Sequence, residues 1–483
     1  RAVRALLAGL EGGSAPAPQP EADPTERSAR RGPQRTLSGA FSQYYYGGNS
    51  KTLTQLKDTP LEGQVPQVVS EQTLSGTDQK QLSSSADVNW RERDADRDLR
   101  MSFRDQYTLD GMPGRPSRNR LTALWADWKE TASGLQARVG RQSGLGGGVL
   151  GRFDGVTGGW SFAPKWKVQG VAGQPTDALL DTHRWFAGAS VEAEALLPQL
   201  GASAYGIQQQ IDGQVDRRAL GLDLRWFSPE TTVFSQLEYD QVLKGLNIAS
   251  VQGTYTLADS TTVNLLLDRR AVPMLMLGNV LFFADPTLPT MPRTLTELLK
   301  LRSLSVLRQQ VSDTTAYSTQ GLLGATTPIN ATWQVGADMR LTRVDAIQPV
   351  PGILPQGLPA TGNLWSGGLQ LIGSNLYSER DTHVFNLTLI KSPTFKGWLL
   401  SYNNLSVPIE RLQVEPSLRL YGQDGPNGVR SMRWTPGMRL AWRGGEKWTL
   451  ESEISIESGR TTGPQQNESA TRLYYYLGYR LDL

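Results

Sequence analysis

The sequence predicts an all-β protein, a transmembrane antiparallel β-barrel of about 20–22 strands. Three observations support this fold class. Short segments alternate apolar and polar side chains with the period of a β-strand. The connections between these segments alternate between short and long. The carboxyl-terminal segments combine an apolar face with aromatic residues at its ends.

The clearest hairpin runs from Trp434 to Glu457 and turns at Gly444-Gly445. One face of both strands is apolar, and the other carries Arg, Thr and Glu. The last strand repeats the pattern up to Leu483. In this it resembles the carboxyl-terminal strand of bacterial outer-membrane proteins. The alternative is an edge strand of a soluble β-sandwich. Aromatic residues near the band edges form a predicted membrane girdle of Trp434, Trp442, Trp448, Tyr475 and Tyr479.

Taken in order, the chain divides into two parts. Residues 1–35 begin with a short apolar piece, expected to end an upstream helical region, and continue as a linker rich in Pro, Ala and charge. Residues 36–483 are the predicted barrel. The linker is expected in the periplasm.

The connections predict the orientation of the barrel. Short links are expected on the periplasmic side at 130–133, 163–165, 228–230, 258–261, 326–330, 406–410 and 444–445. Long links are expected outside at 47–81, 110–118, 141–154, 173–183, 271–311, 345–362 and 422–431. This arrangement requires an even number of strands and returns the amino terminus to the periplasm.

Residues 271–311 form the longest structured insertion. Thr294 and Glu297 match a capping box ahead of several leucines, so a helix is predicted there. A barrel of about 22 strands has a lumen wide enough to need filling. The insertion is therefore predicted to plug or cap the lumen, and the alternative is a helix packed on the outer rim. The residues assigned to this plug or gate are Thr294, Glu297, Leu298, Arg302 and Arg308.

Charged residues on the polar face of the strands are the predicted channel lining. They are Arg100, Arg104, Arg138, Asp223, Arg225, Asp268, Asp338, Arg340, Arg419, Arg439, Arg443, Glu451, Glu453 and Glu457. In one interpretation they line an aqueous path and tune what passes. In the other they pair across neighbouring strands. Arg439 and Arg443 facing Glu451 and Glu453 are expected to be structural pairs.

Composition excludes several function classes. The 483 residues contain no Cys and two His, so no metal site is expected. Lys and Arg number 49 against 46 Asp and Glu, which argues against nucleic-acid binding. No apolar run approaches the roughly 20 residues of a spanning helix. The glycine-rich stretch 146–151 matches a nucleotide-binding pattern but leads into a strand, so no cofactor is predicted. No catalytic grouping emerges, and an enzyme is not expected.

Three stretches carry a family resemblance: SGAFSQYYYGG at 38–48, GRQSGLGGGVLGRFDG at 140–155 and TLTELLKLRSLSVLRQQVSDTTAYS at 294–318. They resemble bacterial outer-membrane barrels that follow tetratricopeptide repeats. In architecture the chain is similar to exporters of cellulose and other exopolysaccharides. The resemblance implies a periplasmic helical-repeat scaffold before a barrel through which a polymer leaves.

The leading hypothesis is an export channel in the bacterial outer membrane for a secreted polymer, polysaccharide or protein. Passage would follow the polar lumen, gated by residues 271–311 and by the loop 141–154. Expected partners are outer-membrane lipid and lipopolysaccharide, and periplasmic repeats or inner-membrane secretion proteins. The alternatives are a diffusion porin for small solutes and a surface scaffold whose barrel is only a membrane mount.

Overall fold

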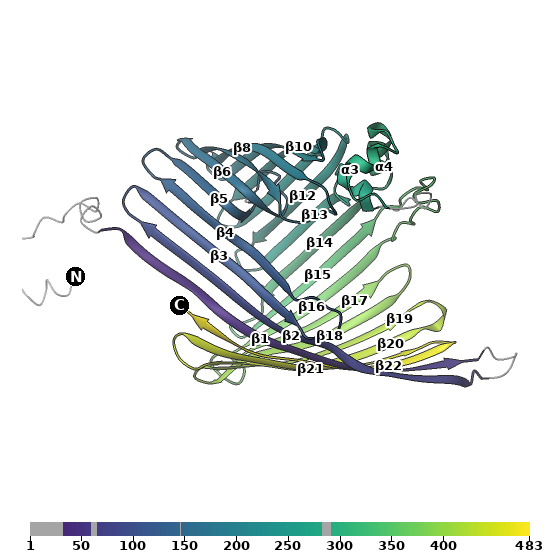
Figure 1. Ribbon diagram of the computed structural model, residues 1–483. Coiled ribbons are helices and arrows are strands. Elements are labelled where there is room, and N and C mark those ends of the chain that lie inside the picture. Colours follow the sequence, from purple (N-terminus) through teal and green to yellow (C-terminus); the bar gives the residue numbers. More distant parts are fainter. Residues whose placement is uncertain (1–31, 59–64, 145, 283–290) are drawn as a thin grey trace, which may run out of the picture.

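The computed structural model describes residues 32–58, 65–144, 146–282 and 291–483. In this part of the chain, 22 strands form one antiparallel sheet in which each strand pairs with its neighbours in sequence. β1 also pairs with β22, from Ala40 opposite Asp482 to Leu56 opposite Gln466, so the sheet closes on itself (Figure 1). The predicted fold class, a barrel of about 20–22 strands, is confirmed.

The strands are long and strongly tilted (Figure 1). The first eleven are β1 (Gln34–Lys57), β2 (Val68–Arg93), β3 (Arg97–Asp110), β4 (Arg118–Glu130), β5 (Leu135–Ser143), β6 (Arg152–Ala163), β7 (Trp166–Pro175), β8 (Arg184–Leu197), β9 (Leu200–Ile211), β10 (Gln214–Phe227) and β11 (Thr231–Asp240). The others are β12 (Gly245–Thr256), β13 (Thr262–Val272), β14 (Ala316–Pro328), β15 (Trp333–Val344), β16 (Leu364–Ser374), β17 (Thr382–Lys391), β18 (Lys396–Ile409), β19 (Leu412–Asp424), β20 (Arg430–Arg443), β21 (Trp448–Thr462) and β22 (Gln466–Asp482).

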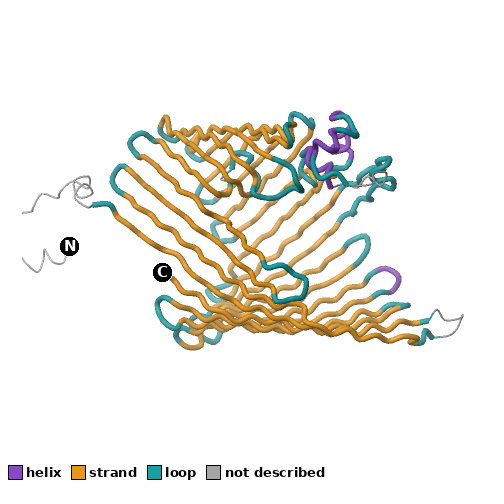
Figure 2. Tube along the Cα trace, in the orientation of Figure 1, coloured by secondary structure: helices purple, strands orange, loops and turns teal. Residues whose placement is uncertain are grey.

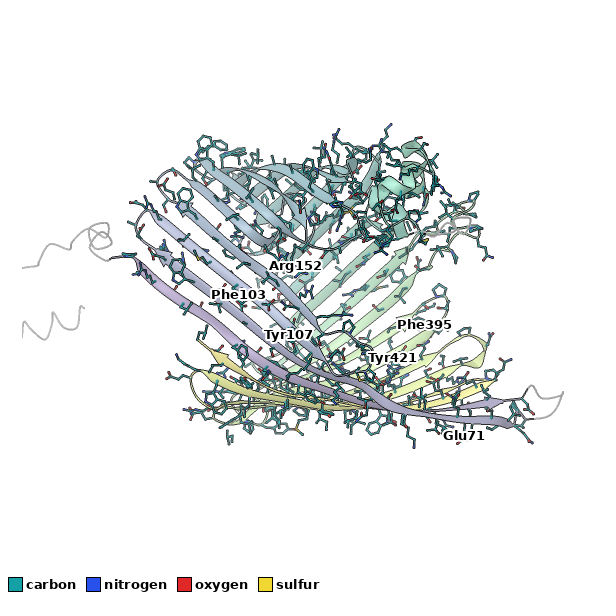
Figure 3. The ribbon with its side chains drawn as sticks, viewed as in Figure 1. Glu71, Phe103, Tyr107, Arg152, Phe395 and Tyr421 are labelled. Atoms are coloured by element: carbon teal, nitrogen blue, oxygen red, sulfur yellow. The ribbon has the colours of Figure 1, made fainter. Side chains whose placement is uncertain are left out.

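Alternation gives the sheet an apolar outer face and a polar inner face. Phe103 and Tyr107 lie on the outer face of β3 (Figure 3). Large apolar side chains remain solvent-exposed on adjacent strands, including Leu222, Leu237, Val251 and Leu267. Exposed apolar surface of this extent needs an apolar environment. The outer face therefore has the form of a lipid-facing band.

The residues of the predicted girdle lie on this outer face. Trp442 and Trp448 meet edge to face beside the Gly444-Gly445 turn, with ring centroids 5.0 Å apart. Trp434 is 49% exposed near the opposite end of β20. Tyr475 packs against Tyr45 and Tyr479 against Phe41, each with centroids 6.3 Å apart. Contact of these rings with lipid headgroups stays a prediction.

The two ends of the barrel differ, as the connections predict. Turns between even-numbered and following odd-numbered strands lie at one end, and the amino end of β1 lies there with Leu483, whose N–H donates to the Gly39 carbonyl at 3.0 Å. The insertions lie at the other end (Figure 2). We call these the short-turn end and the loop end. The prediction that the short-turn end faces the periplasm rests on this pattern.

One predicted long loop is wrong. Residues 47–81 are mostly strand, because β1 and β2 continue as a paired hairpin up to Lys57 and Val68. Their pattern is polar on both faces, with Thr, Ser, Gln and Lys, so no apolar alternation marked them as strand. This hairpin extends beyond the neighbouring strands (Figure 1). The predicted linker lies largely outside the described residues, since 1–31 are not among them.

The predicted helix of the insertion is present as three short pieces. A 3₁₀ helix, η1 (Leu277–Phe282), precedes α3 (Leu295–Leu299) and α4 (Leu304–Asp313). The Thr294 hydroxyl accepts the Glu297 N–H at 3.2 Å, as in a capping box, whereas the Glu297 carboxylate accepts the N–H of Arg293, one residue before the N-cap, at 2.8 Å. Among the described residues, no helix has the length and apolar character needed to cross a bilayer. Residues 283–290 of the insertion lie outside the described part.

The outer face gives a direct prediction. Ile454→Arg places a charge in the middle of β21 on the lipid side, and we expect it to lower the free energy of unfolding by about 2–4 kcal/mol. Ser455→Arg, one residue on, points into the lumen and should cost much less. Both are measured by urea titration of the barrel folded into lipid vesicles. Equal losses for the two variants would contradict the assignment of the faces.

Candidate functional site

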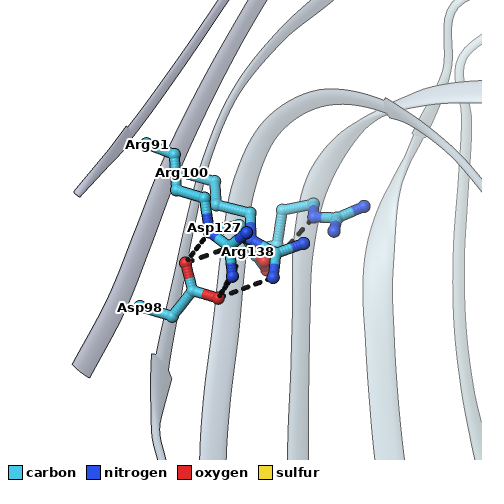
Figure 4. Close-up of polar contacts among 5 residues, drawn as sticks. All are labelled: Arg91, Asp98, Arg100, Asp127 and Arg138. Carbon is cyan, nitrogen blue, oxygen red and sulfur yellow. Dashed lines mark hydrogen bonds and ion pairs between the residues drawn. The ribbon is translucent and has the colours of Figure 1, made fainter. Parts of the chain in front are cut away.

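The inner wall of the barrel is the candidate site, because the predicted lining residues lie on it in groups. Near the short-turn end, the Asp98 carboxylate accepts hydrogen bonds from both Arg91 and Arg100 at 2.6 Å (Figure 4). Beside them, Nε of Arg138 lies 3.2 Å from the carboxylate of Asp127. We call these five residues the charged ladder. It runs across β2 to β5, and its positive and negative side chains largely neutralise one another.

A cavity of about 260 Å³ lies beside the charged ladder. It is lined by the inner faces of β3 to β8 and by the glycine-rich loop between β5 and β6. Lys129 and Lys167 add positive charge to its wall. The loop thus lies inside the barrel and not above its mouth. Its contact with the inner wall could not be predicted from the glycine-rich sequence alone.

Most of the other predicted lining residues also have partners. Arg104 pairs with Asp87 at 2.6 Å, Arg225 with Glu192, and Asp268 with Arg270. Asp223 accepts from the Ser203 hydroxyl at 3.3 Å, and Glu457 lies between Arg433 and Arg472. Cross-strand pairs therefore occupy several of these positions, whereas Asp268 and Arg270 pair within β13.

The expected pairing at β20 and β21 holds for one of two arginines. Arg439 donates to Glu451 at 2.8 Å and to Glu415 at 3.0 Å. It reaches Glu451 diagonally, since its partner in register is Glu453. Arg443 is opposite Thr449 instead, because the register places it beyond both carboxylates.

A second group of lining residues lies open to solvent. Asp338 and Arg340 on β15 and Arg419 on β19 are exposed, although they face inward. A polar hollow of about 570 Å³ runs over the inner faces of β13 to β18 in front of Asp338 and Arg340. We call this side the open wall. Water reaches these charges, so this part of the lumen is not filled by protein.

The inner faces of β9 to β12, next to the open wall in the sheet, are buried, and Glu238 is at their centre. Its carboxylate accepts hydrogen bonds from the Tyr205 hydroxyl at 2.9 Å, from Asn247 at 2.9 Å and from Arg217 at 3.2 Å. Arg217 and Glu238 are each 1% exposed. Arg217 also donates to the carbonyl of Gly148 at 2.7 Å, which fixes the glycine-rich loop to the wall. We call the inner faces of β9 to β12 around these residues the covered wall.

Two β-bulges build the covered wall. The register of β10 shifts between Val215 and Arg217, and that of β12 shifts opposite Glu238 and Tyr239. The extra residues are Asp216 and Asn247, and both hold the insertion. Asp216 accepts the Gly278 N–H at 2.7 Å, and Asn247 accepts the Leu275 N–H at 3.1 Å.

The insertion is thereby fixed along one wall at the loop end. Leu275, Leu277, Leu298 and Leu307 are buried in one apolar cluster with strand residues such as Ile211 and Ala271. The Leu295 N–H donates to Asp212 at 2.8 Å, and Nε of Arg293 lies 2.5 Å from Asp181 in the β7–β8 loop. The Arg293 hydrogen bond lowers the pKa of the exposed Asp181 carboxyl.

The predicted gate residues have different positions. Leu298 anchors α3 in the apolar cluster, and Thr294 and Glu297 cap that helix. Arg302 donates to Gln310 at 3.3 Å, between α3 and α4, and Arg308 lies half-buried on α4. These contacts serve the internal packing of the insertion. Gating by these residues stays a prediction.

Several other sequence expectations can be placed. Residues 146–151 precede β6 and not a helix, as expected for a glycine-rich loop. His183 is exposed at the loop end, whereas His383 is buried with Nδ1 3.0 Å from the Tyr402 hydroxyl. The described residues hold no group of three His, Cys, Asp or Glu side chains placed to bind a metal ion.

Comparison with known proteins finds no matching family model and no matching curated protein. Among solved structures, the siderophore receptor PirA from Pseudomonas aeruginosa is 14% identical, with a TM-score of 0.43, over 91% of this chain and 80% of that one. OccK2 from the same organism is 11% identical, with a TM-score of 0.39, over 92% of this chain and 98% of that one. The P pilus usher PapC translocation pore is 7% identical, with a TM-score of 0.41, over 90% of this chain and 99% of that one. At these values neither substrate nor role transfers to this chain.

The covered wall is tested by Arg217→Ala. The substitution leaves the buried Glu238 carboxylate without its cation, and we expect a loss of roughly 3–5 kcal/mol in the free energy of unfolding. The matched control is Arg218→Ala, since Arg218 is exposed and donates to Gln208. Urea titration in lipid vesicles measures both. Similar stability of the two variants would show that the Glu238 network does not hold this wall.

Proposed function

We propose that the protein is an outer-membrane channel that exports a secreted polymer. The observation that carries the proposal is the unequal filling of the lumen. The covered wall holds the insertion and the glycine-rich loop, while the open wall leaves Asp338, Arg340 and Arg419 in water. A barrel serving only as a membrane mount gains nothing from a wide, charged and solvent-filled interior. An export channel needs such an interior, because a hydrated polymer moves through it.

The attachment of the insertion supports a gating role. The insertion is attached at the loop end to one wall by Asp212, Asp216 and Asn247, through hydrogen bonds to backbone N–H groups. Such a segment narrows the mouth without filling the lumen. Displacement breaks these hydrogen bonds and exposes leucines of the apolar cluster, so the attached position is the stable one. We therefore propose that residues 271–311 limit passage until a polymer arrives.

A diffusion porin is the second candidate, and the open wall favours it as well. The two functions differ in what the insertion does. In a porin the insertion only shapes the opening, whereas in a gated exporter it controls passage. Upstream partners, either periplasmic repeats or inner-membrane secretion proteins, belong to the export proposal alone.

The experiment is conductance of the barrel in planar bilayers with and without the insertion. Val272 and Ala316 are paired in register, so an Asn-Gly turn can replace the residues between them and leave β13 and β14 joined. We expect low conductance for the intact barrel and a several-fold increase after replacement. Equal conductance of both forms would favour the porin, and no conductance in either would leave only a membrane mount.

A second variant with two point substitutions covers the case in which the barrel without the insertion does not fold. Asp216→Ala with Asn247→Ala removes two of the three wall acceptors that hold the insertion and leaves the sequence of the insertion unchanged. We expect brief openings of the size seen after replacement, because the insertion is then released from the wall for part of the time. Arg218→Ala is the control and should behave as the unchanged protein. Unchanged current in the double variant would contradict gating by release from this wall.

A further inference from the structure

Two tyrosine triplets meet where the barrel closes. Residues 44–46 lie on β1 and residues 474–476 lie on β22, and Tyr46 is opposite Tyr476 in register. Alternation turns the middle residue of each triplet outward, and these two pack together on the outer face. The first and third residues of each triplet face the lumen. We call this inner group the tyrosine patch: Tyr44, Tyr46, Tyr474 and Tyr476.

The patch presents a continuous aromatic surface. The Tyr46 and Tyr476 ring centroids are 5.7 Å apart, and those of Tyr44 and Tyr476 are 5.9 Å apart at 78°. Tyr44 and Tyr46 are 6.3 Å apart. All these rings are half-buried, so part of each remains accessible from the lumen. No covering loop is fixed to them among the described contacts, in contrast to the covered wall.

A glycine sets the orientation of Tyr44. A Cβ atom on Gly478 would lie 2.2 Å from Cδ1 of Tyr44, which means that the ring occupies the space above this glycine. The ring therefore lies against the wall and not across the lumen. One face of the ring lies over Gly478, and the other face is directed toward the lumen.

Polar groups frame the patch. Nε of Arg439 donates to the Tyr476 hydroxyl at 3.0 Å, and the same guanidinium binds Glu451 and Glu415. On the other side, the hydroxyls of Ser42 and Ser85 are 2.6 Å apart. The frame is thus rich in hydrogen-bonding groups, and the arginine is neutralised by its carboxylates.

We propose that the tyrosine patch binds sugar rings of a polysaccharide as it moves through the lumen. The proposal rests on the proposed channel function and names its substrate class. One face of a pyranose carries C–H groups that stack on an aromatic ring, while its hydroxyls need donors and acceptors around the edge. The patch supplies both, with Tyr44 and Tyr476 as platforms and Glu451 and Arg439 at the edge. A translocating polypeptide is the less suitable occupant, because the patch presents aromatic rings framed by hydroxyl and charged groups.

The experiment uses the full chain in planar bilayers, in the form with the Asn-Gly replacement if the intact barrel does not conduct. The probes are cellohexaose and maltohexaose, with polyethylene glycol of similar mass as a non-sugar control. We expect the sugars to block the current transiently. In Tyr44→Ala with Tyr476→Ala, the residence time of each block should shorten at least about fivefold, from the loss of aromatic stacking. Blocks by polyethylene glycol should not change.

The outward tyrosines supply a matched control. Tyr45→Ala with Tyr475→Ala removes the same two side-chain types from the same two strands on the other face, and it should leave the sugar blocks unchanged. Tyr44→Phe with Tyr476→Phe keeps the rings and should retain most of the residence time. Equal shortening in the inner and outer alanine pairs would overturn the proposal, as would an absence of sugar blocks in the unchanged barrel.

A second readout separates this inference from the channel function. Titration calorimetry of cellohexaose with the folded barrel in detergent needs no conduction, and its heat should disappear in the inner alanine pair only. A barrel that conducts as proposed but binds sugar equally in all variants overturns the tyrosine patch alone. A barrel that binds sugar at the patch but never conducts overturns the channel and leaves the patch. Binding of tyrosine-free peptides in place of sugars would assign the patch to polypeptide.

Discussion

Backbone hydrogen bonding around a closed ring is the constraint on which the rest of the structure depends. A strand in a bilayer has no water to satisfy its N–H and C=O groups, so each strand needs a partner on both sides. The pairing of β1 with β22 removes the last two edges of a 22-stranded sheet. Closure then fixes two environments for every strand. Side chains that alternate along the chain face outward to an apolar surround or inward to a shared polar space.

The inner space of so wide a barrel is too large for side chains alone to fill. Among the described residues, the glycine-rich loop and the insertion pack against the covered wall. The β-bulges in β10 and β12 place Asp216 and Asn247 beside the regular inward residues, and these extra groups bind backbone N–H groups of the insertion. The Glu238 network holds the glycine-rich loop through Arg217. The open wall beside it leaves Asp338 and Arg340 exposed, so the lumen is filled unevenly.

Features that depend on neighbouring residues could be predicted from the sequence, and features that depend on contacts between distant residues could not. Alternation with period 2 is local, so β20 and β21 and their turn are readable from the residues between Trp434 and Glu457. The capping box at Thr294 is equally local. The tip of the β1–β2 hairpin was missed because both of its faces are polar. Arg443 was assigned to Glu451 and Glu453 by face, whereas its position along the strand decides its partner.

The candidate site depends on contacts that no local pattern contains. Arg217 and Arg340 look alike in sequence, as inward arginines on amphipathic strands, yet one is buried and the other is exposed. The difference lies in which wall the loops bind, and that depends on bulges that alternation does not reveal. The tyrosine triplets were visible in the sequence. Their meeting required the closure of β1 on β22, since more than 400 residues separate them in the chain.

The apolar faces of the strands contact lipid, and the polar faces contact lumen water. The chain has no cysteine, so single cysteines can be introduced along β21 without a background signal. The series Glu453→Cys, Ile454→Cys, Ser455→Cys and Ile456→Cys is labelled in lipid vesicles with a water-soluble maleimide, and lipid nitroxides probe each site. We expect positions 453 and 455 to react with the maleimide from water, and positions 454 and 456 to be reached only from lipid. Water access at all four positions, or the reverse alternation, would contradict this assignment of the faces.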